Sequence, residues 1–205
     1  MSEPSQESLG KTQGPEDSSN EFPQLSRQDF VLSLAFTTLL IVAASCVILL
    51  LTRVNILNHV LMLVTPLPSA PLDFVLIVFL PATMITLEWL LFRFVPRHYW
   101  FEPVNDQLAQ RFNTGELALF FAVGAVSEEL LFRGVLQNLF GFWIATVFFV
   151  VIHVRYLKRP VLLATILILA CGLGGAYLLC GKLWVTILCH FLLNIGAILM
   201  LKKRV

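Results

Sequence analysis

The sequence predicts an all-α protein, a polytopic bundle of about six transmembrane helices with a polar site inside the membrane. Three observations predict this fold class. Hydrophobic residues make up 58% of the chain and charged residues 13%, with a mean hydropathy of +0.83, whereas soluble domains carry roughly 25% charged residues. Several apolar runs are long enough to cross the roughly 30 Å hydrocarbon layer as helices. Most of the basic residues lie in the connections between these runs.

The first 27 residues predict a disordered, polar, cytoplasmic tail. They are rich in Ser, Glu, Gln, Pro and Gly, with five acidic residues against Lys11 and Arg27, and have no apolar content for a core. Neither a basic start nor an early apolar stretch is present, so we expect no cleavable signal peptide there. Residues 30–51 contain no charge and predict the first transmembrane helix.

Residues 53–71 predict a segment at the membrane interface, because their apolar run is short and three prolines follow it. The second transmembrane helix is predicted at 73–94. It contains Glu88, which we expect to pair with an arginine such as Arg93 or Arg133 or to extend toward the headgroups. A contribution of Glu88 to a functional site is the alternative.

A polar connection at 96–115 carries an aromatic cluster of the kind found at membrane interfaces, Tyr99, Trp100 and Phe101. The remaining apolar runs predict the third to sixth membrane segments: 116–140, 142–154, 161–180 and 183–201. The chain therefore divides into the tail (1–27), the first two spans with their connections (28–115), a chemistry-bearing core (116–201) and a basic end (202–205).

The distribution of Lys and Arg predicts the orientation, since cytoplasmic loops are enriched in them. With both termini in the cytoplasm, the outer segments hold only Arg53 and Lys182. The cytoplasmic segments then hold Lys11, Arg27, Arg93, Arg97, Arg111, Arg155, Lys158, Arg159, Lys202, Lys203 and Arg204. We therefore expect a multi-pass protein, in the cell membrane, with the turn around Lys182 facing outward.

Two other features exclude classes of partner or fold. The net charge is +1, which gives no sign of a nucleic-acid partner. The four cysteines lie in apolar runs without a C-x-x-C spacing, so we interpret them as small hydrophobic residues rather than disulfides or zinc ligands: Cys46, Cys171, Cys180 and Cys189.

The stretch from Ser127 to Gly134 puts two adjacent carboxylates and a guanidinium into an apolar helix. Ionisable residues in spans are costly and by default mark a functional site. Glu129 and Arg133 are four residues apart and can pair on one helix face, while Glu128 points away from both. One carboxylate is thus neutralised by its neighbour and one is left for chemistry. A purely structural ion-pair cluster is the alternative.

Two histidines also lie in membrane runs. His190 and Asn194 are one turn apart on one face of the sixth span, and His153 ends the fourth run. Their polar groups and Glu128 would be unsatisfied in hydrocarbon unless they meet in a common cavity. A carboxylate beside an imidazole can take a proton from water, while a second imidazole and an amide can donate to an oxyanion. Two histidines and a carboxylate are also a zinc ligand set, so a zinc-dependent hydrolase stays open.

These residues carry a resemblance to a known family. Glu128-Glu129-x-x-x-Arg133, Phe149-x-x-x-His153 and His190-x-x-x-Asn194, in this order, resemble the three motifs of the CAAX prenyl endopeptidase and bacteriocin-processing (CPBP) family, also called the Abi family. The glycine-containing segment 172–184 is similar to that family's approach to its last motif. The resemblance covers about residues 116–198.

The resemblance implies a glutamate-dependent intramembrane endopeptidase that needs no metal or other cofactor. It assigns three roles: Glu128 with His153 activates water, His190 with Asn194 stabilises the oxyanion, and Glu129, Arg133 and Phe149 support the site. It implies a membrane-associated protein or peptide as substrate. Family members cleave prenylated C-terminal tripeptides, mature bacteriocins, confer bacteriocin immunity or process sorting-signal proteins.

Two other classes of function stay open. A proton-coupled carrier could use Glu128 and the histidines as a relay, although carriers usually show an internal repeat with paired broken helices, and none is visible. A non-catalytic immunity or scaffold protein of the same fold is the other alternative.

One spacing conflicts with a common cavity. By hydropathy His153 ends its run near the cytoplasmic face, whereas Glu128 lies about 12 residues, or about 18 Å, into its helix. Either the third helix begins later than residue 116, or the short fourth run is tilted or re-entrant. We expect the later start.

Overall fold

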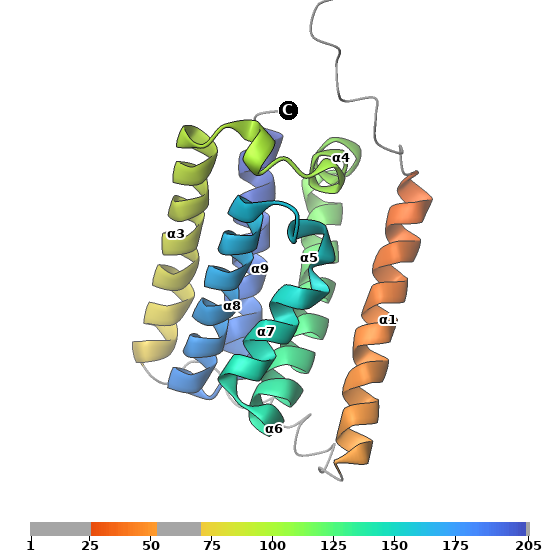
Figure 1. Ribbon diagram of the computed structural model, residues 1–205, viewed down its shortest axis with the longest axis vertical. Helices are drawn as coiled ribbons and strands as arrows, with labels where there is room; N and C mark the ends of the chain where they lie inside the picture. Colours follow the sequence, from red (N-terminus) through yellow and green to blue (C-terminus); the bar gives the residue numbers. More distant parts are fainter. Residues whose placement is uncertain (1–25, 53–70, 204–205) are drawn as a thin grey trace, which may run out of the picture.

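The computed structural model describes residues 26–52 and 71–203, and every regular element in this part of the chain is a helix. The predicted all-α membrane bundle is confirmed (Figure 1). The described helices that are long and apolar enough to cross a membrane are α1 (Arg27–Leu51), α3 (Pro71–Phe94), α8 (Pro160–Cys180) and α9 (Leu183–Lys202). The predictions for the tail before residue 26 and the interfacial segment at 53–70 lie outside the described residues.

The third predicted span is one helical rod in three parts: α5 (Thr114–Glu129), the π-helix η3 (Leu130–Gln137) and α6 (Asn138–Phe140). A capping box starts it. The Asn113 side chain accepts from the backbone N–H of Glu116, and the Glu116 carboxylate accepts from the N–H of Asn113. The rod ends at Gly141, whose φ of 87° lies in the region that favours glycine.

After Gly141 the chain turns back as α7 (Phe142–Ile152), which covers only part of the bundle's height. Its 11 residues rise about 16 Å, roughly half of a hydrocarbon layer. The expected later start of the third helix is therefore wrong, because α5 begins at Thr114. Glu128 and His153 each lie about 12 residues from the Gly141 turn, so both reach about 18 Å from it. The short return helix is what brings them to one depth.

Short elements cap the end of the bundle at which α1 begins and α9 ends: η2 (Arg97–Tyr99), α4 (Pro103–Arg111) and η4 (Val154–Tyr156). Figure 1 shows α4 nearly end-on, so its axis crosses those of the long helices. Arg27 pairs with Glu116, and the Lys202 ammonium donates to the Phe112 carbonyl at 2.6 Å. Both the first and the last described helix are thus tied to the junction of α4 and α5.

Helix α9 is central, because it packs against α3, α5 and α8. A Cβ at Gly196 would lie 2.4 Å from the Ile85 side chain, so α3 and α9 approach closely there. At the start of α3, the buried carboxylate of Asp73 forms a 2.6 Å ion pair with Lys182, the residue before α9. These contacts fix α9, and with it the helix face that carries His190.

Candidate active site

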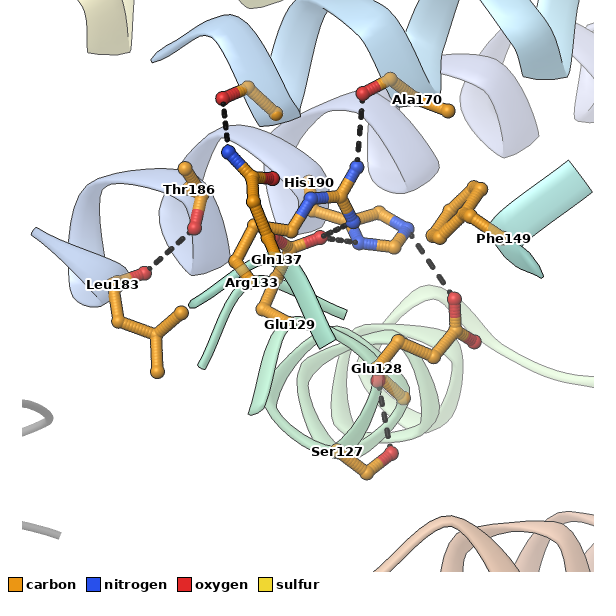
Figure 2. A network of polar contacts seen from close by, with 12 residues as sticks. Ser127, Glu128, Glu129, Arg133, Gln137, Phe149, Ala170, Leu183, Thr186 and His190 are labelled. Atoms are coloured by element: carbon orange, nitrogen blue, oxygen red, sulfur yellow. Dashed lines mark hydrogen bonds and ion pairs between the residues drawn. The ribbon is translucent and has the colours of Figure 1, made fainter. Parts of the chain in front are cut away.

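The centre of the site is a buried ion pair. Arg133 Nη1 lies 2.8 Å from Glu129 Oε1, and the two side chains are 2% and 0% exposed. Arg133 Nη2 donates to the Ala170 carbonyl of α8 at 3.1 Å, and its guanidinium carbon lies 4.7 Å from the centre of the Phe149 ring (Figure 2). The pairing predicted from the four-residue spacing is present, and the hydrogen bond from Arg133 to Ala170 joins the π-helix η3 to α8.

His190 lies between the two glutamates (Figure 2). Its Nδ1 is 2.8 Å from Glu129 Oε1, and its Nε2 is 4.0 Å from Glu128 Oε2. An ionised carboxylate only accepts hydrogen bonds, so Nδ1 carries the proton that binds Glu129. Glu129 therefore holds both Arg133 and the imidazole ring, and fixes which nitrogen of His190 faces Glu128.

Glu128 has a different environment from its neighbour. Its side chain is 23% exposed, and its Oε2 is buried without a hydrogen-bond partner among the described residues. The ion pair of Arg133 is made with Glu129. The Oε2 of Glu129 also lacks a partner there, but that side chain is fully buried, so Glu128 is the carboxylate that a water molecule can reach.

His153 follows the last residue of α7, where the backbone leaves the helical region with φ −82° and ψ 50°. Its Nδ1 lies 2.7 Å from the Phe149 carbonyl. Because a carbonyl only accepts, Nδ1 carries the proton, and Nε2 of the neutral ring is free to take one. The buried Phe149 ring lies between the histidines, with centroid distances of 4.8 Å to His153 and 6.0 Å to His190.

Asn194 lies on α9 one turn beyond His190 and is partly buried. Within the described part of the chain its amide makes no hydrogen bond, so its two N–H donors are open. The structure thus links Glu128, Glu129, Arg133 and His190 by polar contacts. Phe149 joins His153 to them, and Asn194 is placed by its helix.

Three polar groups of the site were not predicted. Gln137 donates to the Gly174 carbonyl at 2.9 Å, and Thr186, one turn before His190, donates to the Leu183 carbonyl at 2.9 Å (Figure 2). Their four-residue spacings from Arg133 and His190 were a usable signal. The role of the third group, the Ala170 carbonyl, could not be predicted from the sequence, because it depends on how α8 packs.

Glu88 differs from the expectation that it pairs with an arginine. Arg133 forms its ion pair with Glu129. Within residues 26–52 and 71–203, Glu88 makes no ion pair with Arg93. Its Oε2 is buried without a hydrogen-bond partner in the same part of the chain. The described residues also contain no group of three or more His, Cys, Asp or Glu side chains arranged to hold a metal ion. Metal independence stays a prediction.

Comparison with known proteins gives one family match. Residues 110–196 match the Rce1-like model, described as type II CAAX prenyl endopeptidase Rce1-like. The chain is 29% identical over 114 residues to "Uncharacterized protein YpbD" of Bacillus subtilis (strain 168), which is 55% of this chain and 58% of that protein. It thus spans a little over half the length of that curated relative. No solved structure matches the chain.

The matched region contains every residue of the three motifs, from Glu128 to Asn194. The resemblance to the CAAX prenyl endopeptidase family is therefore confirmed over residues 110–196.

Proposed function

Because residues 110–196 match the Rce1-like family, we propose that the chain is an intramembrane endopeptidase. It hydrolyses a peptide bond near the C-terminus, or in the membrane segment, of a membrane-associated or prenylated protein. The observation that carries the proposal is the unequal pair of glutamates. Glu129 is fully buried and its Oε1 binds both Arg133 and His190, whereas Glu128 is partly exposed and faces His190 Nε2 at 4.0 Å.

In the proposed reaction Glu128 and His153 activate a water molecule. The water oxygen attacks the carbonyl carbon of the scissile bond, and its proton passes to the carboxylate of Glu128 or to Nε2 of His153. The same proton then goes to the leaving nitrogen as the C–N bond breaks. The products are a new carboxylate and a free amine, so no cofactor is consumed.

His190 and Asn194 donate hydrogen bonds to the oxyanion of the tetrahedral intermediate. For this, His190 needs an N–H at Nε2 as well as the one at Nδ1 that binds Glu129, so the ring acts as an imidazolium. Charge balance supports that state. With Arg133 and His190 positive and both glutamates negative, the buried cluster is neutral, which lowers the cost of placing it in a membrane.

The direct test is cleavage in reconstituted liposomes. The substrates are a peptide with a farnesylated cysteine followed by three residues, and the same peptide without the lipid. We expect wild type to release the C-terminal fragment in ¹⁸O-labelled water with one label in the new carboxylate, and Glu128→Ala to release none. The carrier and scaffold alternatives predict no cleavage by wild type. Equal cleavage by wild type and Glu128→Ala would contradict the proposed role of Glu128.

We also propose that the α4 end of the bundle is cytoplasmic, because that end carries most of the Lys and Arg residues. Lys182 is unsuited to labelling, since it pairs with buried Asp73. Thr52 and Gln110 are exposed near opposite ends of the bundle. We expect a membrane-impermeant maleimide to label Thr52→Cys from outside intact cells and Gln110→Cys only after permeabilisation, with the wild-type chain as background. The reverse pattern would invert the topology.

A further inference from the structure

The chain just beyond α7 places a second aromatic ring against His153. Tyr156 ends η4, and its ring stacks on the imidazole with centroids 5.8 Å apart and planes at 24°. The helix α7 ends one residue before His153, and the His153 backbone is not helical. The side chain therefore has no further residues of α7 on its C-terminal side to hold it in place. Its ring direction is set by one hydrogen bond to the Phe149 carbonyl and by the two rings it contacts.

Tyr156 is in turn held by the other two elements that cap the bundle, η2 and α4, and by the residues between them. Asn105 of α4 donates from Nδ2 to the Tyr156 hydroxyl at 3.3 Å. The neighbouring Arg155 lies 3.5 Å from Glu102, whose carboxylate also accepts from the backbone N–H at the start of α4. Arg159 donates to the His98 carbonyl at 3.2 Å. Three contacts therefore join the turn after His153 to η2, to α4 and to the residue that precedes α4.

The cap is a fixed support, because its apolar side is part of the core. Ala109 and Phe112 are buried with Ile198 and Leu201 of α9. Asp106 pairs with Arg97 across the cap, although its burial raises the pKa of the carboxyl. The contacts from the cap thus extend from the core of the bundle to the ring of His153.

We propose that Tyr156, held by Asn105, is a positioning residue that fixes the His153 ring for proton transfer. The inference rests on the proposed role of His153 in activating water. Packing alone does not account for the hydroxyl, since the Tyr156 ring also lies against the apolar cluster around Phe132 and Phe149, where Phe or Leu would serve. Burial raises the pKa of the Tyr156 phenol, so the hydroxyl keeps its proton.

A graded series of variants tests this in the reconstituted enzyme. Tyr156→Leu removes the stacked ring, and we expect kcat to fall roughly 10- to 100-fold with KM unchanged, as for a misplaced catalytic group. Tyr156→Phe and Asn105→Ala each remove the same hydrogen bond, so each is expected to lower kcat by about 2- to 10-fold. The double variant should be no worse than either single one. Tyr99→Leu, in the same cap but without contact to His153, is the matched control.

A spectroscopic readout separates positioning from general damage. We expect the ¹H–¹³C NMR signal of the His153 ring, assigned by its loss in His153→Gln, to shift in Tyr156→Leu and to stay unchanged in Tyr99→Leu. Wild-type kcat and an unshifted His153 signal in Tyr156→Leu, with Glu128→Ala inactive, would overturn this inference alone. No cleavage by wild type would overturn the proposed function and this inference with it. Additive losses for Tyr156→Phe and Asn105→Ala would contradict the shared hydrogen bond.

Discussion

Glu129→Gln is expected to lose both hydrolysis and fold stability, whereas Glu128→Gln is expected to lose hydrolysis alone. The Glu129 side chain is fully buried and its Oε1 binds both Arg133 and His190. Removing its charge leaves a buried guanidinium unpaired, which typically costs about 3–5 kcal/mol. Glu128 is partly exposed and is not the ion-pair partner of Arg133. Its loss removes the proposed general base, worth about 10²- to 10⁴-fold in rate.

Thermal unfolding in detergent and cleavage in liposomes measure the two effects separately. Glu116→Gln is the matched control, because it removes a carboxylate from the exposed pair with Arg27 and should change Tm little. We expect a large fall in Tm for Glu129→Gln only. Equal losses of activity with equal shifts in Tm for the two variants would contradict the division of roles between the glutamates.

The fold was largely predictable because it depends on local chemistry. Apolar runs of sufficient length become helices wherever polar backbone groups have no other partner in a membrane. The observed α1, α8 and α9 follow the predicted runs closely. The pairing of Glu129 with Arg133 was also predictable, since residues four apart share a helix face. These features need only the residues within one segment.

The rest depends on contacts between segments. Hydropathy gives the length of α7 but not how far it crosses the bundle, and it therefore places His153 near the cytoplasmic face. Counted from the Gly141 turn, His153 instead reaches the depth of Glu128. The bond between His190 and Glu129 joins residues 61 positions apart, and its register is set by the packing of α9 on α5. The Ala170 carbonyl and the cap contacts of Tyr156 are of the same kind.

Asn194 decides between water activation without a metal and a zinc hydrolase built from the same residues. Zinc-ligating histidines usually donate their second N–H to a carboxylate or a carbonyl. Both histidines here do so, His190 to Glu129 and His153 to Phe149. The Nδ1–H groups of the two histidines are therefore compatible with both mechanisms. An amide one turn beyond His190 has no use as a ligand beside imidazole, whereas it suits an oxyanion donor.

We therefore expect Asn194→Ala to lower kcat by about 10²- to 10³-fold with little change in KM, as for other lost oxyanion donors. Asn194→Asp keeps the shape but replaces the N–H donors with acceptors, so it should be at least as inactive. Activity should persist after exhaustive chelation. One zinc per chain, with activity lost on its removal and restored on its return, would replace this mechanism with a zinc-dependent one. Wild-type kcat for Asn194→Ala would remove Asn194 from the site.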